Sequence, residues 1–450
     1  MKPTPSELEA WDRDVVWHGF TPMAEYEPLV IDRAEGCTLI DVNGRRLLDG
    51  VSSLWCNVHG HRHPKIDAAV REQLDKIAHC TSLGMGNSTT AALARRLVDV
   101  TPEGLEHVFF ASDGASSVEA ALKMAFQYWR QRSDPRPQKT KFVALGEAYH
   151  GDTIGSVSVG GIDLFHDLFR PLLFEVLRLP VPDTYRLPAG VAAGQACDFY
   201  TGQVEELLAS RHEEIAALVV EPLVQGAAGM IMQPQGYLRR LRELTRQYDI
   251  LLIADEVATG FGRTGTMFAC EQEEVAPDLM CLGKGLTGGY LAMSTTLASD
   301  EVFQAFDGTY ADLKHFFHGH TYGGNPLAAA AARATLKVFD EEDTLASLPE
   351  KIACVQEHLV RIAELRHVGS ARQRGLMVGI ELVADRATRE PFPWQERRAA
   401  QACRAAIEQG VWLRPLGDVI IVMPPLAMSI EELDQVMLAA EQGIVAATAA

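Results

Sequence analysis

Two residues of opposite charge stand where an α/β protein places its chemistry. Asp255 directly follows an apolar run of strand length, Ile250 to Ala254, and Lys284 lies further along among apolar and glycine residues. A lysine amine in apolar surroundings has a lowered pKa and becomes a nucleophile that forms Schiff bases with carbonyl groups, including that of pyridoxal phosphate. A buried carboxylate keeps the ring nitrogen of such a pyridine protonated. Either residue alone could be a cap or a solvated surface charge, but together they predict Lys284 and Asp255 as catalytic residues around this cofactor.

A second motif, upstream of this pair, could bind an anion. The strand-like run His107 to Ala111 leads into a loop of small residues, Ser112 to Ser117, and then into a long helical pattern. Free backbone N–H groups and the helix dipole favour an anion at such a helix start, although loops of this kind serve packing as often as binding. Beside a Schiff-base lysine, we expect the backbone of Gly114 and Ala115 to hold the phosphate of the cofactor.

Two further strand ends carry side chains that could belong to the same site. Tyr149 follows the predicted strand Lys141 to Leu145, and its ring either stacks on a flat heterocycle or is that of an ordinary half-buried tyrosine. Glu221 follows the predicted strand Ile215 to Val220, and it is either a carboxylate of the site or a cap on the next turn. Open α/β sheets place their ligands at the carboxyl ends of the strands, where both residues stand.

The elements that must position these residues alternate along the chain between strands and helices. This alternation predicts an α/β fold with a mostly parallel sheet. We expect a large cofactor-binding domain over residues 85–330. Residues 1–84 are expected to form an N-terminal arm and part of a small domain, with short strands and a helix from Pro64 to about His79. Residues 331–450 are expected to complete the small domain.

Composition limits the class of protein. The chain of 450 residues carries a net charge of −19 without a block of basic residues, which disfavours nucleic acid or an anionic membrane as a partner. It has neither an apolar signal region near Met1 nor a long uninterrupted apolar run, so a cytoplasmic protein is expected. The eight cysteines include no Cys-x-x-Cys pair, which indicates reduced thiols. His59, His61 and His63 alternate with other residues in a loop-like stretch before Pro64, and no metal site is expected.

One motif is specific enough to indicate a family. The run Asp-Glu-x-x-x-Gly-Phe-Gly-Arg-x-Gly from Asp255 to Gly265, followed by a glycine-flanked lysine, resembles the class III, or ω, aminotransferases of pyridoxal-phosphate fold type I. The resemblance extends from about Trp17 to about Pro425. It implies a large domain with a mostly parallel sheet and a small α+β domain built from both chain ends. It also implies that Lys284 carries pyridoxal 5'-phosphate and moves a proton during amino transfer.

The same resemblance assigns roles to residues outside that motif. It implies that the ring of Tyr149 lies on the pyridoxal face, and that Thr321, with His320 beside it, reaches the phosphate held by the neighbouring subunit. The protein is therefore expected to be a homodimer with its active sites at the interface. Arg414, which stands in an apolar stretch, matches the arginine that binds a substrate carboxylate in this family.

Four further motifs, which begin at Trp17, Asp49, Glu221 and Arg414, resemble one subfamily, the diaminononanoate synthases. These enzymes transfer an amino group to 8-amino-7-oxononanoate in biotin biosynthesis. The resemblance implies that the small-molecule substrates contact Phe20, Leu54, Trp55, Gly319 and Arg414. Phe20 and Leu54 replace a tyrosine and a tryptophan of the members that use S-adenosylmethionine. The amino donor therefore stays open between S-adenosylmethionine and L-lysine.

Other activities would use the same central residues. An ω-amino acid:pyruvate aminotransferase or a dialkylglycine decarboxylase would share Lys284, Asp255 and Tyr149. A nicotinamide-dependent dehydrogenase is excluded, because no Gly-x-Gly-x-x-Gly follows the first strand of the large domain. A scaffold without a cofactor is disfavoured, because Lys284, Asp255, Thr321 and Arg414 are all present.

Overall fold

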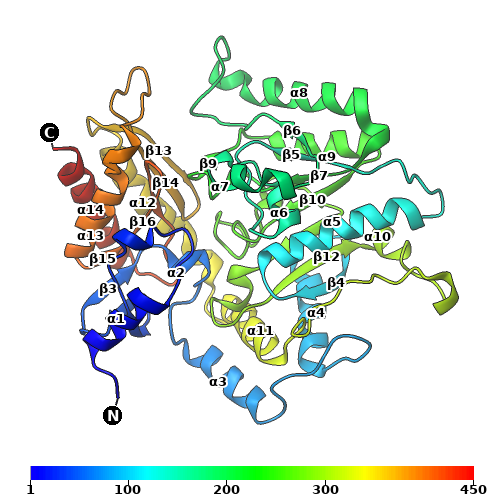
Figure 1. Ribbon diagram of the computed structural model, residues 1–450, viewed down its shortest axis with the longest axis horizontal. Coiled ribbons are helices and arrows are strands. Elements are labelled where there is room, and N and C mark those ends of the chain that lie inside the picture. Colours follow the sequence, from blue (N-terminus) through cyan, green and yellow to red (C-terminus); the bar gives the residue numbers. More distant parts are fainter. Residues whose placement is uncertain (1, 450) are drawn as a thin grey trace.

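The computed structural model describes residues 2–449 and shows a large α/β part beside a smaller α+β part (Figure 1). The blue N-terminal segment and the red C-terminal segment lie together in the smaller part, as the sequence predicts. Within the described residues, no helix combines the length and the apolar character needed to cross a membrane.

The large part is organised around one sheet of seven strands in the order β4-β12-β11-β10-β7-β5-β6. The central strand β10 runs parallel to both of its neighbours, β7 and β11, whereas β12 runs antiparallel to β11 and β4. The prediction of a mostly parallel sheet is therefore confirmed. The strands are β4 (Leu105–Ala111), β5 (Lys141–Leu145), β6 (Leu177–Leu179), β7 (Ile215–Val220), β10 (Leu251–Asp255), β11 (Leu279–Leu282) and β12 (Ser294–Ser299).

Helices cover both faces of this sheet (Figure 1). Successive residues of a strand point to opposite faces, so Leu252 shares a buried core with α8 (Ala196–Arg211) and α9 (Tyr237–Gln247), while Ile253 shares one with α5 (Gly114–Gln131). Strands buried on both faces are continuously apolar, as are β7 and the first four residues of β10. The other helices around the sheet are α3 (Pro64–Leu74), α4 (Ser88–Val100), α6 (Ile154–Val159), α7 (Asp163–His166), α10 (Asp300–Gln304) and α11 (Pro326–Glu341).

The small part contains two sheets of four strands. The first has the order β1-β2-β3-β15, and its last pair is parallel and joins the two ends of the chain. The second has the order β13-β14-β17-β16. The strands are β1 (Ile31–Glu35), β2 (Thr38–Asp41), β3 (Arg46–Asp49), β13 (Val368–Arg374), β14 (Met377–Leu382), β15 (Val411–Trp412), β16 (Arg414–Leu416) and β17 (Val419–Val422). The helices are α12 (Leu348–Ile362), α13 (Arg398–Glu408) and α14 (Ile430–Thr448).

Two local expectations differ from the structure, and one short ladder was not predicted. The predicted N-terminal arm contains a helix, α1 (Pro5–Val15), whose start is fixed by a capping box between Thr4 and Glu7. Helix α3 ends at Leu74 and does not continue to His79. A short two-stranded ladder, β8 (Val224–Gln225) with β9 (Ile231–Met232), follows Glu221. The domain boundaries at residues 84 and 330 stay predictions.

Buried Arg263 ties the two parts together. Its guanidinium donates to the backbone oxygens of Pro424 (2.5 Å) and Asn57 (2.7 Å), so one side chain of the large part holds segments near both ends of the chain. Only 1% of Arg263 is exposed, and burial lowers its pKa to about 10. Such a buried cation depends on both carbonyl partners.

Candidate active site

The predicted lysine and aspartate line one cavity of about 450 Å³ at the carboxyl ends of β10 and β11. These strands are parallel neighbours, which places their ends at the same sheet edge. Lys284 adopts a left-handed backbone conformation with φ of 44°, which is uncommon for a residue with a side chain and typical of functional sites. The cavity is lined by Trp55, Asp113, Gly114, Ala115, Tyr149, His150, Gly151, Asp152, Thr153, Glu221, Ala227, Asp255, Val257, Ala258 and Lys284.

The surroundings of Lys284 favour its neutral amine. Burial lowers the pKa of the amine, and the charges of Asp255 and Glu221 oppose this shift without cancelling it. The amine nitrogen lies 5.2 Å from the ring centroid of Trp55. A neutral amine is the form that attacks a carbonyl carbon, so Lys284 has the character expected of a Schiff-base lysine.

Asp255 is held by two neighbours. It is only 5% exposed, and its Oδ2 lies 2.7 Å from Nδ1 of buried His150, while the backbone N–H of Val257 donates to Oδ1 across 3.0 Å. The other ring nitrogen of His150, Nε2, is buried and has no hydrogen-bond partner among residues 2–449. His150 is not among the predicted site residues, although its position in the Tyr149 to Asp152 motif is a signal for it.

Glu221 is both a wall of the cavity and a support for its loops. Its carboxylate accepts hydrogen bonds from the backbone N–H groups of Tyr149 (3.1 Å) and Gly226 (3.0 Å). Burial raises its pKa to about 7, and the nearby charge of Asp255 acts in the same direction. Glu221 is therefore both a carboxylate of the cavity and an acceptor that caps neighbouring backbone, so the two predicted alternatives do not exclude each other.

Tyr149 lies at the cavity wall with its ring half-buried. Its hydroxyl donates to Oδ2 of Asp152 across 2.8 Å, and its ring meets that of Phe165 edge-on at a centroid distance of 6.5 Å. Burial and the Asp152 carboxylate both raise the pKa of the phenol. The ring is therefore neutral and fixed from its outer end, which suits a surface for stacking.

The small-residue loop forms the start of α5 within the same cavity. Asp113 caps this helix by accepting from the N–H of Ser116 (2.9 Å), and the N–H groups of Gly114 and Ala115 belong to the first turn, where no intrahelical acceptor exists. Gly151 has φ of 117°, and a Cβ there would overlap that of Ala115. The close approach of these backbones leaves a cradle of N–H groups suited to a phosphate.

These observations test whether pyridoxal phosphate fits. A carboxylate, a neutral amine, an aromatic ring and an anion cradle surround one cavity. Among the described residues, the buried Nε2 of His150 also lacks a partner there. The donor set matches a phosphorylated pyridine that carries an aldehyde.

Of the six predicted residues outside the cavity lining, four follow residue 318 in the chain. Gly319, His320 and Thr321 belong to a segment of which Gly319 and Thr321 are exposed, and a Cβ on Gly319 would meet the side chain of Leu83. Arg414 begins β16 and is half-buried. Its guanidinium forms no ion pair or hydrogen bond with another of residues 2–449, and burial lowers its pKa.

The predicted substrate residues near the N-terminus lie at the cavity and its rim. Trp55 lines the cavity, whereas Leu54 and Phe20 are exposed. The ring of Phe20 packs on that of Phe165 at 5.1 Å, and Phe165 in turn contacts Tyr149. Ser52, Ser53 and Trp55 all have positive φ, so this turn is strained where it meets the cavity.

The three histidines considered for a metal point to separate partners. Nε2 of His61 lies 2.9 Å from Asp49, whose carboxylate also accepts from the N–H of Ser53 and so holds the strained turn. His59 contacts the backbone oxygen of Thr335. His61 thus has a structural role beside the site.

Comparison with known proteins points to one family. The model of the class-III aminotransferase family matches residues 21–444. The adenosylmethionine-8-amino-7-oxononanoate aminotransferase of Geobacter sulfurreducens is 49% identical over 441 residues, which cover 97% of each chain. Its counterpart from Aquifex aeolicus is 51% identical over 440 residues, which cover 96% of each chain.

Solved structures give the same result. The crystal structure of the corresponding enzyme from Methanocaldococcus jannaschii has a TM-score of 0.92 and 42% identity, and the match covers 98% of this chain and 99% of that one. An (S)-enantioselective ω-transaminase from Thermomicrobium roseum has a TM-score of 0.94 and 33% identity, with full coverage of both chains. An amine transaminase at 35% identity was solved in its PLP-bound form. The chain belongs to the class-III aminotransferases, which are pyridoxal-phosphate-dependent enzymes.

Proposed function

We propose that this aminotransferase converts 8-amino-7-oxononanoate to 7,8-diaminononanoate, a step of biotin biosynthesis. The proposal rests on one observation. About half of the residues, over nearly the whole chain, are identical to those of enzymes named for this substrate. The reaction would be ping-pong: a donor gives its amino group to the enzyme, and the ketone then receives it.

Each residue of the cavity would have its own role in the reaction. When bound, pyridoxal phosphate acts as an electron sink for the substrate carbon that loses its proton. Lys284 would hold the cofactor through its amine and then move the proton as general base and acid. Asp255, fixed by His150, would face the ring nitrogen, and Tyr149 the ring. The N–H groups of Gly114 and Ala115 would bind the phosphate.

Arg414 would bind the distant carboxylate of 8-amino-7-oxononanoate, because a half-buried guanidinium without an acidic partner among residues 2–449 is suited to an external anion. An Arg414→Ala variant should raise the KM for this substrate at least tenfold and leave the half-reaction with the donor unchanged. A change of similar size in both half-reactions would contradict this role.

The protein is proposed to act as a homodimer. Thr321 and His320 lie away from the cavity lining of their own chain, which fits a role toward a neighbouring subunit. Two segments, 163–172 and 310–322, also expose large apolar side chains that a second copy could cover: Leu164, Leu168, Leu172, Tyr310, Phe317 and Tyr322. Mixed Lys284→Ala and Thr321→Ala subunits test this, because a heterodimer has one complete site only if Thr321 acts across the interface. Activity no higher than that of Thr321→Ala alone would contradict it.

A cytoplasmic location is also proposed. All eight cysteines are free thiols, which suits a reducing compartment.

The first experiment would follow the absorbance of the lysine-bound cofactor after addition of S-adenosylmethionine or L-lysine alone. The donor that converts the cofactor is the donor of the enzyme, and Phe20 and Leu54 lie where its pocket would be. The aminated enzyme would then receive 8-amino-7-oxononanoate or pyruvate. Recovery of the original absorbance with pyruvate only would replace the proposal with an ω-amino acid:pyruvate aminotransferase.

A further inference from the structure

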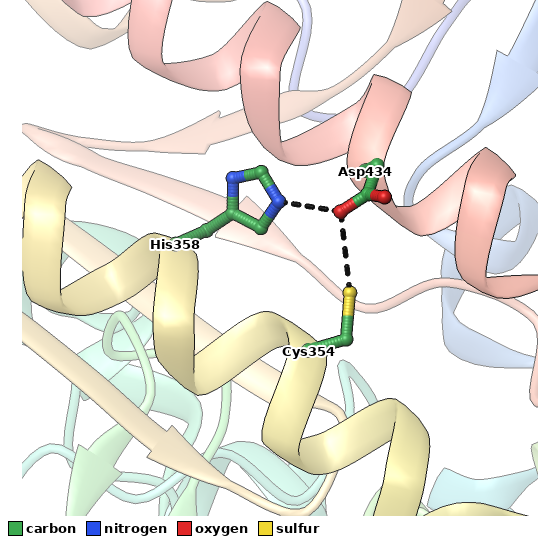
Figure 2. A group of neighbouring side chains, drawn as sticks. All are labelled: Cys354, His358 and Asp434. Atoms are coloured by element: carbon green, nitrogen blue, oxygen red, sulfur yellow. Dashed lines mark hydrogen bonds and ion pairs between the residues drawn. The ribbon is translucent and has the colours of Figure 1, made fainter.

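Three metal-ligating side chains meet in the small part, on helices that do not contribute to the cavity lining. Cys354 and His358 lie one turn apart on α12, and Asp434 faces them from α14 (Figure 2). Oδ1 of Asp434 lies 2.7 Å from Nε2 of His358 and 3.4 Å from Sγ of Cys354. One ligand atom from each residue lies within 4.8 Å of the other two.

The three donors have the chemistry that zinc prefers. Thiolate, imidazole and carboxylate are its usual ligands, and two ligands four residues apart on a helix share one face. Tetrahedral zinc places such donor atoms about 3.3–3.8 Å apart. The sulfur to oxygen distance of 3.4 Å already fits. The nitrogen to oxygen distance of 2.7 Å must open slightly, which the half-exposed Asp434 carboxylate can allow by turning.

We propose that Cys354, His358 and Asp434 form a binding site for a divalent transition metal ion, with zinc as its best fit, and that the ion cross-links α12 to α14. The exposed side of Asp434 leaves the fourth position to water. The ion would serve the packing of the small part, since none of its ligands lines the cavity. The absence of Cys-x-x-Cys pairs, on which the expectation of no metal site depended, does not exclude this cluster, because its third ligand comes 76 residues after the histidine.

One neighbouring side chain, Arg361, opposes binding of the ion. Nη2 of Arg361 lies 2.6 Å from Nδ1 of His358, so this nitrogen accepts a hydrogen bond. A metal on Nε2 requires the proton on Nδ1, and two donors would then face each other. Arg361 must therefore turn away, and Glu441, 4.0 Å from its Nε, is placed to receive it.

Without a metal ion, the same residues form a hydrogen-bonded link between the two helices. The thiol and the imidazole then both share the Asp434 carboxylate. Burial raises the pKa of the Cys354 thiol to about 11, so metal binding must release its proton. The experiment must therefore distinguish a bound metal ion from this hydrogen-bonded link.

Cobalt distinguishes a bound ion from the metal-free link by its absorbance. A thiolate bound to Co²⁺ gives a charge-transfer band, and tetrahedral Co²⁺ gives a band at the red end of the visible range. Tag-free holoenzyme, stripped with a chelator, would be titrated with Co²⁺ and followed by difference absorbance. We expect one Co²⁺ per chain, both bands, and displacement by Zn²⁺. Absence of the thiolate band at saturation would overturn the proposal.

One matched pair of variants and one further control complete the test. Cys354→Ser keeps a donor to Asp434 but removes the thiolate, so it should abolish the band and weaken Zn²⁺ binding by more than about tenfold. Cys197→Ser, in the large part, should change neither. His107→Gln removes the histidine of an exposed group with Glu106 and Asp300 and should also leave the band intact.

Arg361→Leu removes the opposing donor and its charge, so it should tighten Zn²⁺ binding several-fold. The same substitution should weaken the helix link if no metal binds, because His358 loses its partner. Thermal unfolding of the holoenzyme with and without Zn²⁺ distinguishes these results. A band that survives Cys354→Ser, or Zn²⁺ affinity unchanged in both Cys354→Ser and Arg361→Leu, would overturn the assignment.

Discussion

Nδ1 of His150 lies 2.7 Å from Oδ2 of Asp255, and both side chains are buried against the cavity in which the cofactor is proposed to bind. The histidine and the backbone N–H of Val257 each occupy one oxygen of the carboxylate. The orientation of Asp255 therefore depends on His150, which makes the histidine a positioning residue.

Replacement of His150 by leucine should loosen the cofactor. The Asp255 carboxylate would lose a buried donor, which costs about 1–3 kcal/mol and corresponds to a roughly 5- to 150-fold higher dissociation constant for pyridoxal phosphate. His150→Asn, which can still donate from its amide, should recover much of the affinity. Equilibrium dialysis with cofactor fluorescence measures both values. Equal affinities of the leucine variant and the unaltered protein would show that Val257 alone orients the carboxylate.

Glu221 should make the apoenzyme less stable as the pH rises toward neutrality. Its folded pKa of about 7 lies above the ordinary value of 4.5, so the folded state binds more protons between these two values. The stabilisation is complete below about pH 4.5 and is lost as the pH rises through 7, by about 3 kcal/mol in total. Urea unfolding of the apoenzyme at pH 5 and pH 7.5 would measure it.

Glu221→Gln is the control for that measurement, because it does not titrate. It loses one acceptor for the N–H groups of Tyr149 and Gly226, so a constant offset in stability is expected. The pH slope is the readout. The same slope in both proteins would mean that another group causes it.

Gly151→Ala should weaken cofactor binding more than overall folding. The new Cβ would overlap that of Ala115 and push the first turn of α5 out of the phosphate cradle, in addition to the strain of its positive φ. Gly190→Ala is the matched control, since Gly190 also has positive φ but has no atom within 4 Å of an added Cβ. Only the Gly151 variant should lose bound pyridoxal phosphate on gel filtration. If both variants kept their bound pyridoxal phosphate, the assignment of this cradle as the phosphate site would be wrong.

Arg263→Leu should destabilise the protein by about 2–5 kcal/mol, because two buried backbone oxygens lose their donor. The oxygens belong to Asn57 and Pro424, so the attachment of the small part should weaken first. Hydrogen exchange monitored by mass spectrometry would show faster exchange around both residues. Faster exchange confined to the loop around Arg263 would contradict its role as a tie.

The central part of the site could be predicted from the sequence because its signals are local and its geometry follows from the sheet. Asp255 and Lys284 follow strands β10 and β11, and parallel neighbours end at the same edge. Gly114, Ala115 and Tyr149 line the same cavity because β4 and β5, which precede them, run in the same direction as β10. The capping box at Thr4 is an equally local signal, and it marks the start of α1.

The remaining residues depend on distant partners. His150 gains its meaning from Asp255, which is 105 residues away, and no local pattern marks that contact. Thr321 and Arg414 lie outside the cavity lining, and their roles require a second subunit or a bound substrate. Cys354 and His358 could be paired by helix spacing alone, but Asp434 enters only through the packing of α14 against α12.

The parallel pairing of Leu48 with Val411 has a consequence for the order in which the enzyme matures on the ribosome. All seven strands of the large sheet lie between residues 105 and 299, so that sheet can assemble long before the partner of β3 has been synthesised. Until then β3 is an edge strand with an unpaired side. The ring centroid of Trp55, a few residues after β3, lies 5.2 Å from the amine of Lys284, so the strand that waits for its partner also leads into a wall of the cavity.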